Sequence, residues 1–104
     1  MRKYEIQIRN EVKLDIEQIK DFIVKNTSRE HAESYAADLY AEIRSLTYLA
    51  DSIKVTEWKI AKEFSKSKRE KVLLTSNKKW NIFFHTYRDK VIVDKILASK
   101  LVVE

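Results

Sequence analysis

The second half of the chain alternates apolar runs with short polar breaks, which is the pattern of consecutive β-strands. The apolar runs are Val72–Leu74, Trp80–Tyr87, and Val91–Val93 continued by Ile96–Leu97. They are rich in aromatic and β-branched residues, as strands are. The polar breaks at Asn77–Lys79 and Arg88–Asp89 are three and two residues long. Connections this short force neighbouring strands to run antiparallel, because a parallel return needs a dozen or more residues. We therefore expect a three-strand meander over residues 71–100.

The start of the chain predicts one strand followed by a helix. Lys3–Arg9 alternates apolar and polar side chains, which indicates a half-buried strand. Asn10 is a suitable helix N-cap, and Glu11 would lie in the first turn, where the helix dipole favours a carboxylate. Four apolar residues then recur at helical spacing and predict a helix to about residue 26. They are Val12, Ile16, Ile19 and Ile23.

A second helix is predicted after a short connection. Ser28 or Thr27 can cap its start, and His31 would then be a solvated residue of the first turn. A long apolar stripe follows and fades near residues 51–52. Its members are Ala32, Tyr35, Ala36, Leu39, Ile43, Leu46 and Ala50. The connection of two or three residues makes the two helices an antiparallel hairpin.

Residues 53–69 mix two hydrophobic periods. A short strand, a third helix, and a loop that docks Trp58 and Phe64 on the core all remain open for this segment. Ser65–Lys71 is a basic run and is expected to be a loop. With one domain over residues 1–104, the predicted fold class is α+β, with the order β-α-α-β-β-β. The helical hairpin should pack on one face of a mainly antiparallel four-strand sheet.

Composition narrows the classes of protein. The chain has no Cys, which excludes disulfides and thiolate zinc sites, and no Gly, which excludes phosphate-binding glycine loops. No apolar run approaches the ~18 residues of a membrane span, and no signal peptide is visible, so a cytoplasmic protein is expected. Pro is absent too, so turns must be formed by other residues. Asn adopts left-handed backbone most easily among them, and we expect such positions at Asn10, Asn26 and Asn77.

Charge is distributed unevenly along the chain. Residues 54–104 hold 13 basic and 6 acidic side chains, whereas residues 1–53 hold 8 basic and 10 acidic ones. A basic half suggests an acidic or polyanionic partner. A lysine-rich soluble surface is the alternative explanation.

The central run of the meander divides into two faces, because side chains of a strand alternate. The face expected to pack on the helices consists of Trp80, Ile82, Phe84 and Thr86. The face expected to be open consists of Asn81, Phe83, His85 and Tyr87. His85 could titrate near neutral pH there.

Basic side chains surround the predicted open face. Aromatic and basic residues together on a sheet are typical of nucleic-acid binding. The candidate residues for binding a nucleic acid or a protein partner are Lys78, Lys79, Asn81, Phe83, Tyr87 and Arg88. The alternative is a second hydrophobic face, covered by a partner or by residues 53–69.

This order of elements resembles the RelE/ParE toxin superfamily of type II toxin–antitoxin systems. The resemblance rests on Tyr4–Ile6, Asp15–Ile23, Asn81–Phe84, Asp89–Val93 and Ile96–Leu97. It implies a growth-inhibiting toxin, often serving plasmid stabilisation, that a small cognate antitoxin wraps and neutralises. No cofactor is expected, and a homodimer remains open. The sequence shows no clustered metal-ligand spacing and no apolar run long enough for a membrane, so neither a metal site nor membrane association is expected.

The superfamily has two branches with different targets. ParE-like members poison DNA gyrase, whereas RelE-like members cleave mRNA on the ribosome with basic residues of the sheet. In this chain the RelE-like lysine pair falls near Val72 and Leu74, or on Lys71 and Leu73 if the alignment shifts by one, and the two RelE-like arginines fall on Asn81 and near Leu101. The two long helices also resemble the ParE-like branch, which the resemblance therefore favours. The rival is an endoribonuclease in which His85 would act as base, with Lys71 and Lys100 as phosphate-binding cations and Lys79 beside them. A non-toxic binding module is a third alternative.

The end of the chain carries an apolar tail, Leu101–Val103. A solvent-exposed apolar tail has no stabilising role, so we expect it to pack on the sheet or to join a partner.

Overall fold

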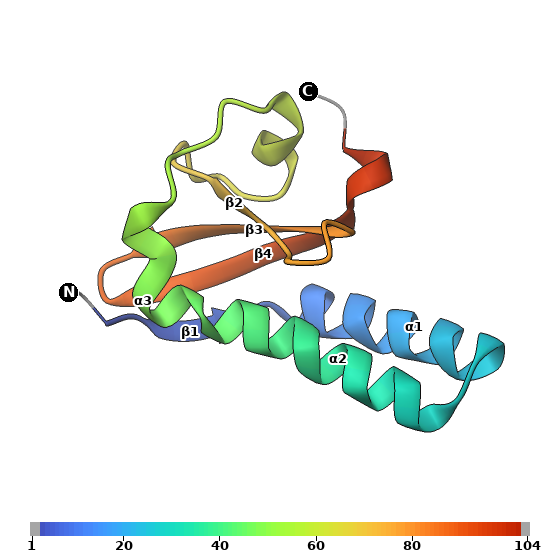
Figure 1. The fold of residues 1–104 in the computed structure, drawn as a ribbon. Coiled ribbons are helices and arrows are strands. Elements are labelled where there is room, and N and C mark those ends of the chain that lie inside the picture. The colour runs from blue at the N-terminus through green and yellow to red at the C-terminus, as the bar shows by residue number, and fades with distance from the viewer. Residues whose placement is uncertain (1–2, 103–104) are drawn as a thin grey trace.

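A four-strand sheet carries a helical hairpin on one face and an irregular segment on the other (Figure 1). The structure is a computed structural model that describes residues 3–102. The strands are β1 (Glu5–Ile8), β2 (Lys71–Leu74), β3 (Trp80–Tyr87) and β4 (Lys90–Ala98). The helices are α1 (Asn10–Asn26), α2 (Arg29–Arg44) and α3 (Leu46–Leu49), with 3-10 turns η1 (Ala50–Ser52), η2 (Lys59–Glu63) and η3 (Ser99–Leu101). The predicted α+β class and element order are confirmed.

The sheet is mixed, with the order β1-β4-β3-β2. The β2-β3-β4 meander is antiparallel throughout, as its short connections predict. β1 is parallel to β4, with Glu5 opposite Lys90. The helical hairpin, residues 53–69, β2 and β3 lie between these two strands in the sequence, which provides the long connection that a parallel pair requires.

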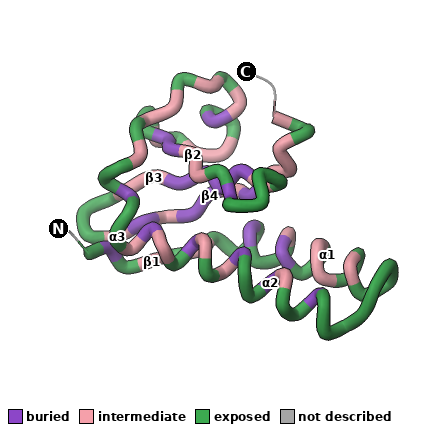
Figure 2. The backbone as a smooth tube through the Cα atoms, viewed as in Figure 1, coloured by how far each residue is buried: buried purple, intermediate pink, exposed green. Residues whose placement is uncertain are grey.

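The core lies between the helical hairpin and the sheet (Figure 2). Val12 and Ile16 of α1 are fully buried, and the predicted stripe of α2 is buried from Ala32 to Ile43. Ile82 and Phe84 of β3 meet these helices, as the alternation of the strand predicts. Among the described residues, no helix is both long and apolar enough to cross a membrane.

The two helix starts differ in how they are capped. Ser28 caps α2, and its hydroxyl accepts a hydrogen bond from the backbone N–H of His31 at 3.1 Å. His31 itself is exposed, as expected. The prediction for α1 is wrong, because Asn10 is already helical and Arg9 occupies the N-cap position without a side-chain cap. The Arg9 side chain instead reaches the sheet, where it pairs with Asp94.

Left-handed backbone occurs in both hairpin turns, at Lys78 with φ 62° and at Arg88 with φ 57°. The prediction of Asn10, Asn26 and Asn77 is therefore wrong. The side chain of Asn77 accepts a hydrogen bond from the Lys79 backbone N–H at 3.0 Å. This Asx-type bond closes the turn with Asn77 itself in ordinary backbone and leaves the left-handed position to its neighbour.

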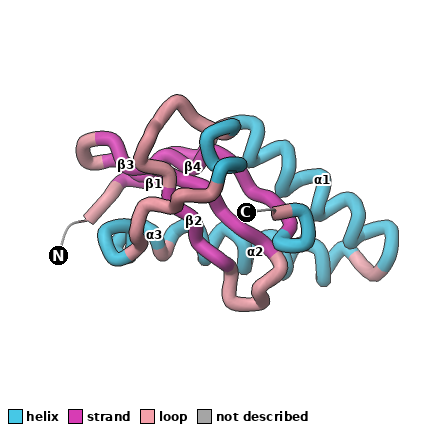
Figure 3. The backbone as a smooth tube through the Cα atoms, turned by 90° about the horizontal axis from the view of Figure 1, so that it is seen from above, coloured by secondary structure: helices cyan, strands magenta, loops and turns pink. Residues whose placement is uncertain are grey.

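Residues 53–69 cross the face of the sheet opposite the helical hairpin (Figures 1 and 3). Trp58 and Phe64 contact the ring of Phe83, with centroid distances of 6.3 and 4.8 Å. Phe83 is fully buried as a result. The loop that docks Trp58 and Phe64 is thus the alternative that holds, and the expectation of an open face at Phe83 is wrong.

Candidate functional sites

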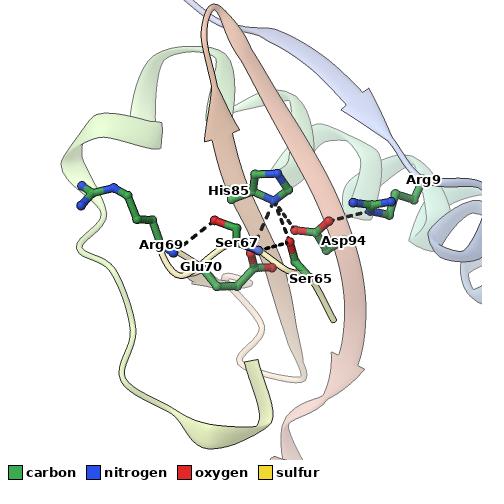
Figure 4. A network of polar contacts seen from close by, with 7 residues as sticks. All are labelled: Arg9, Ser65, Ser67, Arg69, Glu70, His85 and Asp94. Atoms are coloured by element: carbon green, nitrogen blue, oxygen red, sulfur yellow. Dashed lines mark hydrogen bonds and ion pairs between the residues drawn. The ribbon is translucent and has the colours of Figure 1, made fainter. Parts of the chain in front are cut away.

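Three ionisable side chains meet on the sheet face beneath residues 53–69 (Figure 4). Glu70 lies just before β2, His85 lies on β3, and Asp94 lies on β4. His85 Nδ1 is 2.6 Å from Asp94 Oδ2 and 3.5 Å from Glu70 Oε1. One polar atom from each of the three residues falls within 4.8 Å of the others. We call Glu70, His85 and Asp94 the acid–histidine cluster.

A β-bulge directs Asp94 into this cluster. Phe83 pairs with Lys95 and Phe84 pairs with Val93, so Asp94 has no direct partner on β3. Bulges of this kind re-aim side chains and are frequent next to functional sites. The Asp94 side chain is fully buried, and its Oδ1 accepts a hydrogen bond from Arg9 Nε at 2.6 Å. Arg9 thereby links the β1–α1 junction to the cluster.

Glu70 is the least satisfied member of the cluster. It is 3% exposed, and neither of its carboxyl oxygens has a hydrogen-bond partner in the structure. Burial, together with the adjacent Asp94, raises the pKa of Glu70 to about 9 against the opposing effect of the Arg9 charge. The protonated form of Glu70 is therefore favoured at neutral pH in the metal-free protein.

The acid–histidine cluster communicates with solvent through a hollow of about 790 Å³. Arg9, Lys62, Lys66 and Tyr87 are among the residues that line it, together with His85. Ser65 adds a hydroxyl, 3.5 Å from His85 Nδ1. An imidazole and two carboxyls beside an open hollow could exchange protons or bind a cation.

A second hollow, of about 930 Å³, lies between α1 and the end of the sheet where η3 follows β4. We call it the basic groove. Its large apolar side chains are Ile19, Phe22, Trp80, Ile96, Leu97 and Leu101. Its basic side chains are Lys78, Lys79, Lys95 and Lys100.

Phe22 and Leu101 expose apolar surface in the basic groove, at 67% and 57% of their areas. The positive charge of Lys95 is compensated, because its ammonium group forms ion pairs with Asp15 and Glu11 of α1 at 2.9 and 3.1 Å. Within residues 3–102, no ion pair involves the other three lysines of the groove. The groove therefore combines apolar surface with net positive charge. Of the predicted apolar tail, Leu101 lines this groove, and Val103 lies outside the described residues.

The candidate partner-binding residues do not form one surface. Lys78 and Lys79 lie at the groove end of β3, whereas Tyr87 and Arg88 lie at its other end. Six residues of strand separate Asn81 from Tyr87, which is about 20 Å. Asn81 is buried, and its amide donates a hydrogen bond to Ser99 Oγ at 3.0 Å. Its role here is to hold η3 in place.

The candidate catalytic residues are also separated. Lys71 pairs with Phe84, so its side chain points to the helix side, where its ammonium group donates to the Ala50 carbonyl at 2.8 Å. Burial lowers the pKa of Lys71. His85 faces the opposite side of the sheet, and Lys100 lies in the basic groove. The structure does not bring His85, Lys71 and Lys100 together.

The sequence did not point to three residues in or beside the acid–histidine cluster, namely Arg9, Glu70 and Asp94. Asp94 carried a usable signal, because a charged residue inside an apolar central strand is rarely buried without partners. Glu70 carried none, since it stands in a basic run that resembles a solvated loop.

Comparison with known proteins finds similarity among solved structures. Neither a protein-family model nor a curated protein sequence matches the chain. A solved structure described as "Chromosomal ParDE TA system from P. aeruginosa" contains a chain with 14% sequence identity and a TM-score of 0.73. The match covers 90% of this chain and 94% of that chain. The protein therefore shares the fold of that chain.

Proposed function

We propose that this protein is the toxin of a bacterial type II toxin–antitoxin pair, acting in the cytoplasm on DNA gyrase and neutralised by a cognate antitoxin. The observation that carries the proposal is the fold, which matches a ParDE toxin–antitoxin structure over nearly the full length of both chains. Fold alone does not determine function. The proposal therefore also draws on the sites described above.

The basic groove fits an antitoxin segment as its occupant. Exposed Phe22 and Leu101 provide apolar contacts, and Lys78, Lys79 and Lys100 provide positive charge around them. The complementary ligand is an amphipathic acidic helix, which would place its apolar side in the groove and its carboxylates on the lysines. An acidic antitoxin has this chemistry.

The arrangement of cations favours gyrase over mRNA as the target. Cleavage of RNA requires a base and phosphate-binding cations around one scissile bond. Lys71 is bonded to the Ala50 carbonyl on the helix side, away from His85. Lys100 lies at the groove end of the sheet. A protein that binds its target instead of cleaving it requires no such cluster.

Induced expression in bacteria tests the proposal. We expect growth arrest with filamentation and DNA-damage signalling, and inhibition of gyrase supercoiling by purified protein. Rapid translation arrest with cleaved mRNA, lost in His85→Ala, would instead indicate the endoribonuclease. No growth defect would leave a non-toxic binding module.

The antitoxin is tested separately. A small acidic protein encoded beside the gene should co-purify with this chain and restore growth when it is co-expressed. If no neighbouring product binds, the assignment to a toxin–antitoxin pair fails, whatever the result with gyrase.

A further inference from the structure

The acid–histidine cluster has the donor set of a metal site. It offers one imidazole nitrogen and two carboxylates, contributed by the residue before β2 and by two neighbouring strands. These positions are fixed by the fold. Asp94 is held by the bulge and by Arg9, and the Glu70 backbone carbonyl accepts a hydrogen bond from Thr56 N–H at 2.8 Å. Residues on rigid elements are the ones that can preorganise a site.

A second observation comes from Glu70. Its carboxyl is buried and directed at His85 and Asp94, and neither oxygen has a hydrogen-bond partner (Figure 4). An unsatisfied buried carboxylate is costly unless it is paired or coordinates a metal. A bound cation would displace the Glu70 proton, and it would compensate the charge of the second carboxylate, because Arg9 supplies only one guanidinium.

We propose that Glu70, His85 and Asp94 bind one divalent transition-metal ion, of which Zn²⁺ is the best match. Imidazole and carboxylate together suit Zn²⁺, which takes four ligands, whereas Mg²⁺ and Ca²⁺ require six or more oxygen donors. Nothing in the proposed toxin function requires this ion, so the inference stands apart from it.

Two donor separations, from His85 Nδ1 to each carboxylate, can be compared with those of a zinc site, and all three donor atoms lie within 4.8 Å of one another. Ligand bonds of about 2.0–2.2 Å at tetrahedral angles place donor atoms about 3.4 Å apart. Glu70 Oε1 and His85 Nδ1 are already separated by 3.5 Å. The 2.6 Å separation of His85 Nδ1 and Asp94 Oδ2 would have to open by less than about 1 Å.

The surroundings supply the other parts of a site. Arg9 bonds Asp94 Oδ1, the oxygen that does not face His85, and so orients the carboxylate as an outer-shell partner does. The fourth position can be filled by Ser65 Oγ or by water from the hollow. The same hollow gives the ion access from solvent.

Calorimetric titration of the metal-free full-length protein with Zn²⁺ tests the site. We expect one ion per chain and a thermal midpoint that rises with Zn²⁺ concentration, with no effect of Mg²⁺. Glu70→Gln and Asp94→Asn keep the size of each side chain and should weaken Zn²⁺ binding at least about tenfold. His31→Ala, which removes the other histidine, is the matched control and should bind as the wild type does.

A measurement on the wild type does not depend on the folding of any variant. Imidazole nitrogen resonances should shift on Zn²⁺ addition at His85 Nδ1 and not at His31. The proposal is overturned if the wild type binds no stoichiometric Zn²⁺, if both cluster variants bind as tightly as the wild type, or if the shift falls on His31 or on Nε2 of His85.

Discussion

Asp94 Oδ2 lies 2.6 Å from His85 Nδ1, and Asp94 Oδ1 lies 2.6 Å from Arg9 Nε, so one buried carboxylate joins two strands and the start of α1. The contact exists because the bulge leaves Asp94 without a direct partner on β3. An apolar residue at position 94 could not form the contacts that the carboxylate makes with Arg9 and His85. The energetic role of the carboxylate is open to direct measurement.

Replacing Asp94 by Asn should lower stability. The amide fills the same volume but loses the charge that pairs with Arg9 and His85, and we expect a loss of about 1–3 kcal/mol in the free energy of unfolding. Urea denaturation of the metal-free wild type and variant measures this difference in the free energy of unfolding. Asp89→Asn is the control, because Asp89 is exposed in the β3–β4 turn, and it should stay within about 0.5 kcal/mol of the wild type. Equal stability of the two variants would show that the buried carboxylate contributes nothing.

Stability should also fall as pH rises, through Glu70. The carboxyl has a pKa of about 9 in the folded protein, against an ordinary value of 4.5, so the folded state holds a proton that the unfolded state has lost. Its contribution is therefore complete below pH 4.5 and is lost as pH rises toward 9, with a slope of at most about 1.4 kcal/mol per pH unit.

Denaturation series in the presence of a chelator measure this pH dependence. Glu70→Gln cannot ionise, so its stability should vary less with pH and should exceed that of the wild type near pH 9. Glu57→Gln removes an exposed carboxyl of the same type and should follow the wild type. A wild-type curve that is flat between neutral pH and pH 9 would contradict the buried, protonated Glu70.

The parts of the fold that follow from local periodicity could be predicted from the sequence. The helix stripes of α1 and α2 and the two faces of β3 each repeat over several residues, so single irregular positions do not hide them. The cover over Phe83 could be predicted only as one alternative among several, because Trp58 and Phe64 fit neither the strand nor the helix period. Asp94 shows the same limit, since its burial depends on strand pairing across the bulge.

The β2–β3 turn should gain stability from glycine at residue 78. Lys78 has φ 62°, a region that costs a residue with a Cβ roughly 1 kcal/mol and glycine nothing. Lys78→Gly should therefore raise the thermal midpoint. Lys79→Gly is the control in the same turn, because Lys79 has negative φ, and it should lower the midpoint or leave it unchanged. A lower midpoint for Lys78→Gly would mean that the Lys78 side chain stabilises the fold by more than its left-handed backbone costs.

The basic groove should account for antitoxin affinity. Phe22 is 67% exposed on α1 and lines the groove, whereas Leu14 is 64% exposed on the same helix but outside it. Because exposed side chains contribute little to folding, both alanine variants should keep the stability of the wild type within about 0.5 kcal/mol. Phe22→Ala should raise the Kd for the co-purified antitoxin about tenfold or more, as loss of an aromatic anchor does.

Charge in the groove is tested with the same binding assay. Lys100→Glu should weaken the complex and reduce its salt dependence, because an acidic segment would then meet a like charge. Lys66→Glu changes the charge of the chain equally but lies at the other hollow, beside His85, so it serves as the matched control. Equal loss of affinity in the two variants would show that the antitoxin responds to net charge alone. Unchanged affinity in both Phe22→Ala and Lys100→Glu would place the antitoxin on another surface.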